Sequence, residues 1–318
     1  MSVPQHILDR LGPQHAARRL DLERRLLKKQ VAQERGVFPI RRYLSINTLA
    51  RLGISLCGLT ERGFRNILDI HIVENEVILP ELPEAFEGFR LLQLADLHCD
   101  IHPLLMRAIC EKMKEVSHDA VVLVGDYHNE IMDPFEESLE AMRQFIPHLH
   151  PVRFAILGNH DYLAKVPVFE ECGLPVLLNE AHSLERDGKR LWICGVDDAH
   201  FFRTHDLALA RAGIPDGEIS ILLSHTPETH REAAYLEYHL HLSGHTHGGQ
   251  ICLPSPSGGI PILNNTHGCR RELIAGPWRE GAMLGYTSRG TGSAGVAARF
   301  NCPPEITLHI LTRGISKK

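Results

Sequence analysis

Short apolar runs alternate with amphipathic stretches along most of the chain. From residue 69 onwards the apolar runs are brief and rich in β-branched residues, which is typical of buried strands. These runs predict strands at 70–79, 89–95, 120–124, 153–157, 191–196, 219–223, 239–242, 282–286 and 305–311. The amphipathic runs between them predict helices at 102–116, 134–145, 205–211 and 229–234. The alternation predicts an α/β or α+β layered domain, and the strand-rich C-terminal part argues against a purely parallel sheet.

The N-terminal part of the chain has a different pattern. Residues 14–35 predict a helix in which Ala16, Leu20 and Leu27 fall near one face, with basic residues nearly opposite. Residues 49–59 form a second amphipathic stretch, although two glycines in it weaken the helical pattern.

Two interpretations of this N-terminal part remain open. It could be a helical hairpin packed on the domain, or a basic amphipathic element that lies on an anionic membrane surface. In either case we divide the chain into a basic amphipathic helical segment, residues 1–65, and a domain that spans residues 66–318.

Charge is distributed unevenly between these two parts. Residues 1–65 contain 13 Lys and Arg against 5 Asp and Glu, a surplus of 8, whereas the whole chain has a net charge of −5. The remaining residues therefore carry a net charge of −13. A basic segment of this kind favours contact with an anionic surface, whereas the acidic domain argues against nucleic acid as a partner.

Composition indicates an ordinary intracellular protein. The 318 residues are 43% hydrophobic and 23% charged, and the 8 cysteines include no C-x-x-C pair, which favours a reducing cytosol. No run approaches the roughly 18–20 apolar residues of a membrane span, and the first 30 residues hold no apolar signal segment. Arg41-Arg42 only partly resembles a twin-arginine signal. We expect a cytoplasmic protein, peripheral on the inner membrane if residues 1–65 bind lipid.

Five short polar motifs each follow a predicted strand. They are Asp96-Leu97-His98, Gly125-Asp126, Gly158-Asn159-His160-Asp161, Ser224-His225 and Gly244-His245-Thr246-His247. Any one of them would suit a strand-end turn or a core histidine, but five in one chain point to a common site. Because residues i and i+2 of extended chain point the same way, Asp96 and His98 could bind one ion, and so could His245 and His247.

The residue types in these motifs suit a pair of divalent cations. The two oxygens of Asp126 could bridge two ions, and Asn159 offers an amide oxygen. Mixed oxygen and imidazole ligands favour Mn, Fe or Zn over Ca. Two such ions about 3.5–4 Å apart clamp a phosphoryl group and lower the pKa of a bound water toward ~7, so that hydroxide attacks phosphorus in line. His160 is a natural acid, because the neighbouring Asp161 would raise its pKa.

From Phe89 to Leu311 the chain resembles the calcineurin-like metallophosphoesterases. The segments 244–250, 286–290 and 300–307 resemble a narrower bacterial branch. That branch contains phosphodiesterases similar to YaeI and YkuE, and the chlamydial-type UDP-2,3-diacylglucosamine pyrophosphatase. The resemblance implies a two-sheet β-sandwich flanked by helices, with the metal ions at the strand ends and an N-terminal helical extension outside the match.

The resemblance also implies a role for each motif residue. It implies one metal site formed by Asp96, His98 and His247. It implies a second formed by Asn159, His225 and His245, with Asp126 bridging the two. His160 would donate a proton to the leaving oxygen or stabilise the transition state, and Asp161 would orient His160.

Three further residues are less certain in role. Asn129 stands where the family often has an acidic residue, which affects the tuning of the metal site. His128 either faces the substrate or is a polar loop residue. Arg289 either binds phosphate or is a solvated arginine in a structural turn.

The sequence thus predicts a dinuclear-metal hydrolase of phosphodiester or pyrophosphate bonds. One candidate substrate is a nucleotide-linked lipid of the UDP-2,3-diacylglucosamine type, which would imply a role in lipid A biosynthesis. The alternatives are a phosphomonoesterase, a phosphoprotein phosphatase or a non-catalytic scaffold with the same fold. We expect residues 1–65 and a Pro- and Gly-rich loop at 253–281 to select the substrate.

Overall fold

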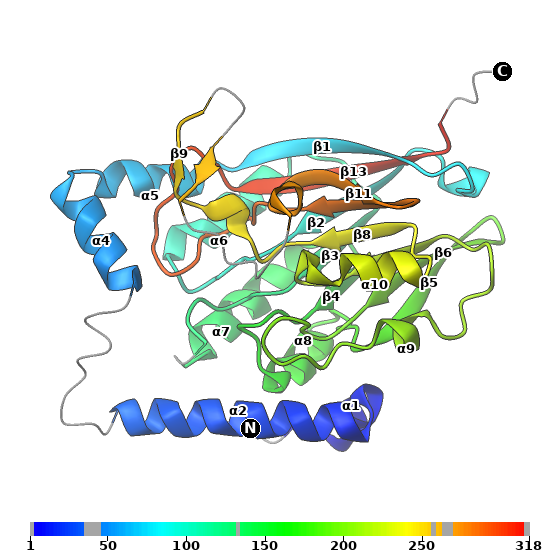
Figure 1. Cartoon of the computed structure of the whole chain (residues 1–318), viewed down its shortest axis with the longest axis horizontal. Helices are drawn as coiled ribbons and strands as arrows, with labels where there is room; N and C mark the ends of the chain where they lie inside the picture. Colours follow the sequence, from blue (N-terminus) through cyan, green and yellow to red (C-terminus); the bar gives the residue numbers. More distant parts are fainter. Residues whose placement is uncertain (1–2, 35–45, 132–133, 256–258, 263–269, 315–318) are drawn as a thin grey trace.

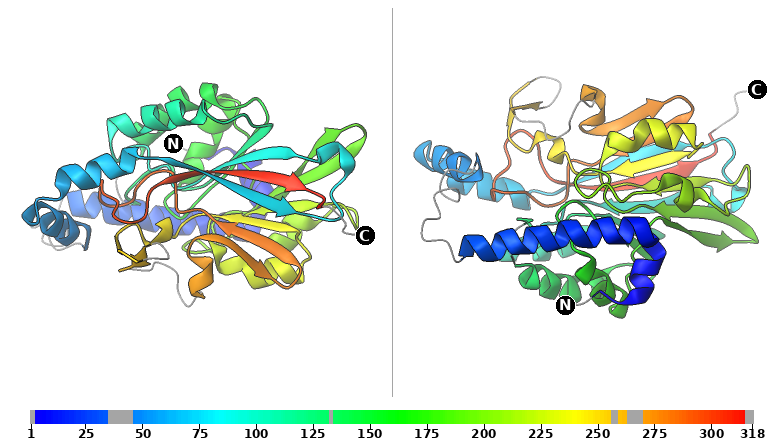
Figure 2. Two further views of the ribbon diagram at one scale, coloured as in Figure 1. Left: turned by 90° about the horizontal axis from the view of Figure 1, so that it is seen from above. Right: turned by 60° about the horizontal axis from the view of Figure 1, so that its bottom comes forward.

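Two β-sheets pack face to face, and helices cover their outer faces (Figures 1 and 2). The computed structural model describes residues 3–34, 46–131, 134–255, 259–262 and 270–314, with only the backbone described for 30–34 and 46. This arrangement confirms the predicted two-sheet architecture with flanking helices.

The first sheet has the strand order β1-β13-β2-β3-β4. Its strands are β1 (His71–Ile78), β2 (Phe89–Leu94), β3 (Ala120–Val124), β4 (Arg153–Ile156) and β13 (Glu305–Thr312). β2, β3 and β4 are parallel, and β13 runs antiparallel to β2 but parallel to β1. The sheet is mixed, as the sequence predicts.

The second sheet has the order β11-β12-β8-β7-β6-β5. Its strands are β5 (Glu180–Arg186), β6 (Lys189–Gly195), β7 (Ser220–Leu223), β8 (Leu240–Ser243), β11 (Gly276–Glu280) and β12 (Met283–Thr287). A separate hairpin pairs β9 (Cys252–Leu253) with β10 (Ile260–Pro261). β6, β7, β8 and β12 are parallel, so β7 and β8 end at the same edge of the sheet.

Alternation along the strands builds two apolar layers. On β3, Val122 and Val124 face the second sheet, whereas Val121 and Leu123 belong to the layer under the helices. The helices are α6 (Pro103–Met113), α7 (Glu136–Phe145) and α8 (Val166–Glu171) beside the first sheet, and α9 (Leu207–Arg211) and α10 (His230–Tyr235) beside the second.

α1 (Gln5–Leu11) and α2 (Pro13–Glu34) form a hairpin that packs on the domain. Ile7 and Leu11 are buried in the layer under the helices, and Leu26 packs with Tyr162 and Phe202. The helix predicted at 14–35 thus packs on the domain, but its partner in the hairpin is α1 and not the amphipathic stretch at 49–59. Among the described residues, no helix is long and apolar enough to cross a membrane.

α4 (Ile46–Leu56) and α5 (Thr60–Leu68) lie apart from that hairpin, at another end of the molecule (Figure 1). α5 continues through the predicted boundary at residue 65. Arg41 and Arg42, on which the comparison with a twin-arginine signal rests, lie outside the described residues.

Every predicted strand and helix is present, with ends that differ by a few residues. The sequence pattern missed α1, α5, α8, β5, β9, β10 and β11. The prediction of a long loop at 253–281 is wrong in part, because β10 and β11 lie within this range. Gly and Pro in β11 are atypical of strands, so the sequence did not indicate a strand there. β11 is an edge strand that is held by its antiparallel pairing with β12.

Candidate metal centre

The five sequence motifs converge where the carboxyl ends of strands from both sheets meet. β2, β3 and β4 end in the first sheet, and β7 and β8 end in the second. Backbone contacts lock the loops together: Asp96 N donates to the Gly125 carbonyl at 3.0 Å, and His245 N donates to the Asp96 carboxylate at 3.0 Å. The motif side chains are thus held in one buried place by two independent sheets.

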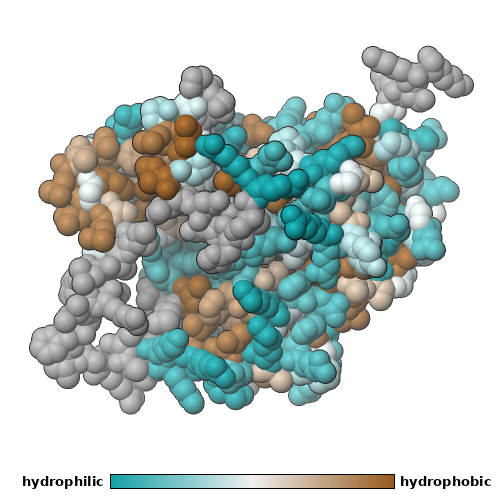
Figure 3. Space-filling model, in the orientation of Figure 1, coloured by the Kyte–Doolittle hydropathy of each residue, from teal (hydrophilic) through white to brown (hydrophobic). Residues whose placement is uncertain are grey.

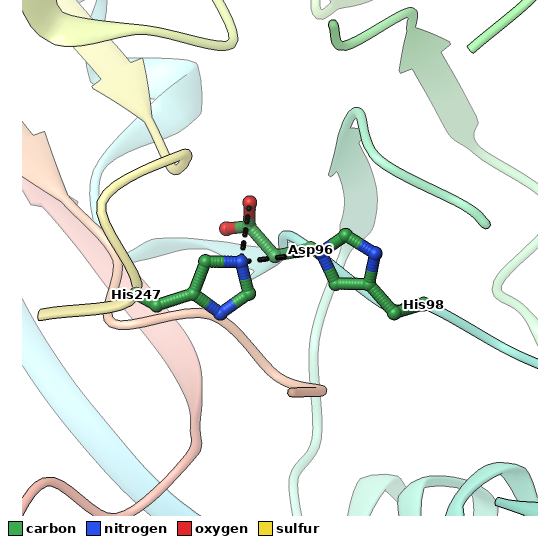
Figure 4. A group of neighbouring side chains, drawn as sticks. All are labelled: Asp96, His98 and His247. Atoms are coloured by element: carbon green, nitrogen blue, oxygen red, sulfur yellow. Dashed lines mark hydrogen bonds and ion pairs between the residues drawn. The ribbon is translucent and has the colours of Figure 1, made fainter. Parts of the chain in front are cut away.

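Asp96, His98 and His247 form a first cluster of metal-competent atoms (Figure 4). Their ligand atoms lie within 4.8 Å of one another. The Nε2 atoms of His98 and His247 are 3.1 Å apart, and Asp96 Oδ1 is 3.5 Å from His247 Nε2. All three residues are buried.

Asp126, His225 and His245 form a second cluster that meets the same 4.8 Å limit. His225 Nε2 is 3.1 Å from Asp126 Oδ2. The amide oxygen of Asn159 adds a fourth donor atom, 3.2 Å from His225 Nε2 and 2.9 Å from His245 Nδ1. The two clusters adjoin, since Asp96 Oδ1 is only 3.9 Å from His225 Nε2.

Hydrogen bonds to backbone carbonyls fix the orientation of two imidazole rings of the site. His98 Nδ1 donates to the His128 carbonyl at 2.9 Å, and His225 Nδ1 donates to the Val124 carbonyl at 2.7 Å. In the neutral rings the Nε2 lone pairs therefore point into the site, and the buried Nε2 of His245 has no partner among the described residues. This donor set fits divalent cations of the Mn, Fe or Zn type.

Electrostatics also indicate a place for positive charge. Burial raises the pKa of Asp96 to about 7. Burial opposes a charged His225, yet the negative charge of Asp126 raises the pKa of that imidazole to about 10. The negative charge of the two carboxylates is thus compensated by a proton on Asp96 or by a charged His225 ring. A bound cation would supply the same positive charge.

Backbone strain is concentrated in these loops. Positive φ angles occur at Asp96 (54°), His98 (41°), Asp126 (60°), His245 (70°) and His247 (52°). Such angles are unfavourable for residues that carry a Cβ and persist only where the surrounding structure fixes them. Strain at five motif residues is typical of a functional site.

Two glycines allow the loops to approach each other closely. A Cβ on Gly158 would lie 2.1 Å from Asp126 Oδ1, and a Cβ on Gly244 would lie 2.5 Å from Asp96 Oδ2. Any other residue at either position would displace a carboxylate of the site.

His160 lies at the edge of the centre. Its Nε2 is 3.9 Å from Asp126 Oδ2, its ring meets the edge of the His98 ring at a centroid distance of 5.2 Å, and a fifth of its side chain is exposed. Its Nδ1 is buried and has no partner among the described residues. The imidazole is thus placed between the buried ligand atoms and the surface.

Asp161 does not bond the His160 ring as we expected. Its carboxylate accepts instead from the backbone N–H groups of Asp126 at 2.8 Å, Tyr127 at 3.0 Å and Gly158 at 2.9 Å. It therefore holds two loops of the site in register.

His128 and Arg289 each have a partner of their own. His128 is buried, and its Nδ1 is 2.9 Å from Lys165 Nζ. Arg289 Nη1 is 3.3 Å from Glu305 Oε2, with 38% of the side chain exposed. The substrate contacts proposed for both from the sequence stay predictions.

Asn129, the departure from the family pattern, serves the loops. Its Oδ1 accepts from Gly295 N at 2.7 Å, and its own N donates to Asp100 Oδ1 at 2.8 Å. It braces the loop after β3 rather than facing the two clusters.

Comparison with known proteins identifies the chain. A family model described as calcineurin-like phosphoesterase matches residues 89–249. The chain belongs to this family. It is therefore a metal-dependent hydrolase, and the two clusters are its candidate metal-binding groups.

Three bacterial relatives of this phosphoesterase are 26–28% identical to it over the aligned residues. The uncharacterized metallophosphoesterase YkuE of Bacillus subtilis is 28% identical and covers 78% of this chain and 89% of its own. The phosphodiesterase YaeI of Escherichia coli is 26% identical, covering 69% and 81%. The UDP-2,3-diacylglucosamine pyrophosphatase LpxG of Chlamydia trachomatis is 26% identical, covering 71% and 85%.

Sequence reasoning missed two buried basic side chains beside the phosphoesterase centre, those of Lys165 and Arg299. Lys165 Nζ is 2.7 Å from Asp161 Oδ1. Arg299 Nη2 donates to the Gly292 carbonyl at 2.7 Å and lies 3.2 Å from His247 Nδ1. Neither belongs to a strand-end motif, and the only signal for Arg299 is a lone arginine in a stretch of small residues.

Proposed function

We propose that this phosphoesterase hydrolyses phosphodiester or diphosphate bonds with two divalent cations held by the two clusters. The proposed ligands are Asp96, His98, Asp126, Asn159, His225, His245 and His247. The observation that carries the proposal is the convergence of metal-competent oxygen and nitrogen atoms from five strand ends in two adjoining buried clusters. Asp126, whose Oδ2 is 3.1 Å from His225 Nε2, would be the carboxylate shared by both ions.

When bound, the cations would polarise the phosphoryl oxygens and lower the pKa of a coordinated water to about 7. The residues of the chain do the remaining work. His160, partly exposed at the edge of the centre, gives a proton to the leaving oxygen or stabilises the negative charge that develops there. Asp161 is a positioning residue that fixes the loops carrying Asp126 and Asn159.

The proposed substrate class is a nucleotide-linked lipid of the UDP-2,3-diacylglucosamine type. Support comes from the similarity to LpxG, which is named for that pyrophosphatase activity. Manganese is the first metal to test, and a role in lipid A biosynthesis would follow from this substrate. Association with an anionic membrane through the N-terminal segment would give access to a lipid.

The same centre could serve other phosphoryl substrates. A phosphomonoester, including a phosphoprotein, needs the same clamp and the same proton donor, so the proposed alternative is a phosphomonoesterase. A non-catalytic scaffold would need the seven candidate ligands for another purpose, and no other use of them is evident.

A substrate panel separates these alternatives. Purified protein supplied with Mn, Fe or Zn would be incubated with bis-p-nitrophenyl phosphate, p-nitrophenyl phosphate and UDP-2,3-diacylglucosamine, with UMP release as the readout for the last. We expect hydrolysis of the diester and release of UMP. Hydrolysis of the monoester alone would favour the phosphomonoesterase, and no hydrolysis with any metal would favour the scaffold.

A further inference from the structure

The helix α4 exposes its apolar face, because its leucine side chains are exposed. Leu49, Leu52 and Leu56, at helical spacing i, i+3 and i+7, are 55%, 55% and 79% exposed. The polar Asn47 lies on the inward side, where it donates to Glu130 Oε1 at 2.9 Å. A helix that faces water shows the opposite arrangement.

The β9–β10 hairpin repeats this arrangement. Leu253 and Ile260 are directly paired, so they share one face of the hairpin with Ile262, and all three are 40–56% exposed. The other face carries Cys252, which is buried, and Pro261, which lies against Gly249 beside the metal centre. The hairpin turns its apolar side chains outward.

The segment 298–300 contacts both α5, which directly follows α4, and the β9–β10 hairpin. Gly63 of α5 lies against Ala298 and Phe300, and Phe300 O accepts from Cys252 N at 2.9 Å. In Figure 3 apolar side chains gather over this part of the molecule. We call Leu49, Leu52, Leu56, Leu253, Ile260 and Ile262 the apolar rim; they are half of the twelve exposed large hydrophobic residues among the described part of the chain.

The apolar rim lies next to basic groups. The helices α4 and α5 contain Arg51, Arg62 and Arg65 against one acidic residue, Glu61, although residues 66–318 are acidic as a whole. Arg62 and Arg65 are exposed. Apolar side chains bordered by arginines match the boundary between the headgroups and acyl chains of an anionic bilayer.

We propose that the apolar rim inserts into the surface of a lipid bilayer that contains anionic headgroups, with the arginines of α5 at the headgroup level. The docking element is therefore α4 with the β9–β10 hairpin, and not the α1–α2 hairpin, whose apolar face is used in packing on the domain.

Docking by this face would bring the metal centre to the membrane. The hairpin begins five residues after His247, and the N-terminal end of α4 bonds Glu130 in the loop after β3. The substrate would then be a phosphoester of a lipid, a consequence that rests on the proposed function. The docking itself does not depend on catalysis.

Co-sedimentation with vesicles tests the proposal. The full chain would be mixed with vesicles of phosphatidylcholine alone or with a third of phosphatidylglycerol, and hydrolysis of water-soluble bis-p-nitrophenyl phosphate would be measured in parallel. We expect binding to the anionic vesicles, and Leu49→Ser/Leu52→Ser/Leu56→Ser should weaken it by at least about 100-fold while hydrolysis is unchanged. Arg62→Gln/Arg65→Gln should weaken binding to anionic vesicles only.

The control replaces three exposed apolar residues outside the apolar rim, as Leu27→Ser/Ile78→Ser/Leu209→Ser, and should bind like the parent chain. Lack of vesicle binding by the parent chain would overturn the docking proposal but not the hydrolase function. Vesicle binding without hydrolysis would overturn the hydrolase function but not the docking. Loss of binding in Lys28→Gln/Lys29→Gln but not in the leucine variant would place the contact on α2 and overturn it. So would a stable dimer that the leucine variant dissociates.

Discussion

The Nε2 atoms of His98 and His247 lie 3.1 Å apart inside a fully buried cluster. His98 Nδ1 donates to the His128 carbonyl, so in the neutral ring Nε2 has a lone pair that points at His247. Burial lowers the pKa of His98 to about 4, so a second proton on this ring is disfavoured and the lone pair remains available to a cation.

We therefore predict that removing metal destabilises the protein. Dialysis against a chelator should lower the thermal midpoint by about 5 °C or more, and Mn or Zn at a hundredfold excess over Kd should restore it, since such binding contributes about 2.7 kcal/mol. Differential scanning calorimetry measures the shift. Identical midpoints with and without metal would contradict a cation in this cluster.

Gly158 leads to a prediction about the position of Asp126. In Gly158→Ala the new Cβ would lie 2.1 Å from Asp126 Oδ1, so the carboxylate must move, and we expect diester hydrolysis to fall by about 100-fold. Gly53→Ala is the matched control, because no atom lies within 4 Å of its Cβ; it should retain activity. Equal activity of the two variants would show that the spacing at residue 158 is unimportant.

Arg19 connects α2 to the loop after β4, which carries Asn159 and His160. Its guanidinium is fully buried, bonds the Asp161 carbonyl and Glu23, and lies 3.7 Å from the buried Asp197. Arg19→Met would leave the buried carboxylates unpaired, so we predict a loss of about 3 kcal/mol in the free energy of unfolding, measured in urea.

Arg25→Met provides the comparison on the same helix. Its partner Asp21 is 51% exposed, and the pair should contribute less than about 1 kcal/mol. If the two substitutions cost the same, α2 does not pack on the domain as described.

The positions of the metal-competent residues could be predicted because each directly follows a strand that reads clearly in the sequence. Asp96 and His98 follow β2, and His245 and His247 follow β8. Parallel strands of one sheet end at one edge, so the motifs after β2, β3 and β4 are expected to meet, and so are those after β7 and β8. That the two edges adjoin is a property of the tertiary packing, which this rule does not give. The fold class followed from the same alternation of strands and helices.

The supporting residues could not be predicted because their partners are distant in sequence. Arg299 meets His247 only once the segment 298–300 has folded over the site, and Arg19 reaches Asp161 across 142 residues. α4 shows another limit: its leucines form an amphipathic pattern, but the pattern alone does not show whether they face the core or, as in the structure, outward.

His241 leads to a prediction about pH and stability. It is buried beside Trp278, neither ring nitrogen has a partner in the described part of the chain, and burial lowers its pKa to about 3. The unfolded chain, with a pKa of 6.5, binds a proton that the folded chain does not, so stability falls as pH drops from 6.5 toward 3.

His241→Leu removes this titration. Between pH 7.5 and pH 5 the variant should lose about 2 kcal/mol less unfolding free energy than the parent, as measured in urea at both pH values. A parallel loss in the parent and the His241 variant would mean that His241 is hydrated.

The most direct test of the account is the rate of bis-p-nitrophenyl phosphate hydrolysis by Asn159→Ala and His247→Ala, each supplied with Mn and checked for folding by circular dichroism. Each substitution removes one proposed ligand from a different cluster. If both clusters hold a catalytic cation, each folded variant should lose at least about 100-fold in rate and bind less metal than the parent. Parent-like rates in either folded variant would contradict a two-metal centre.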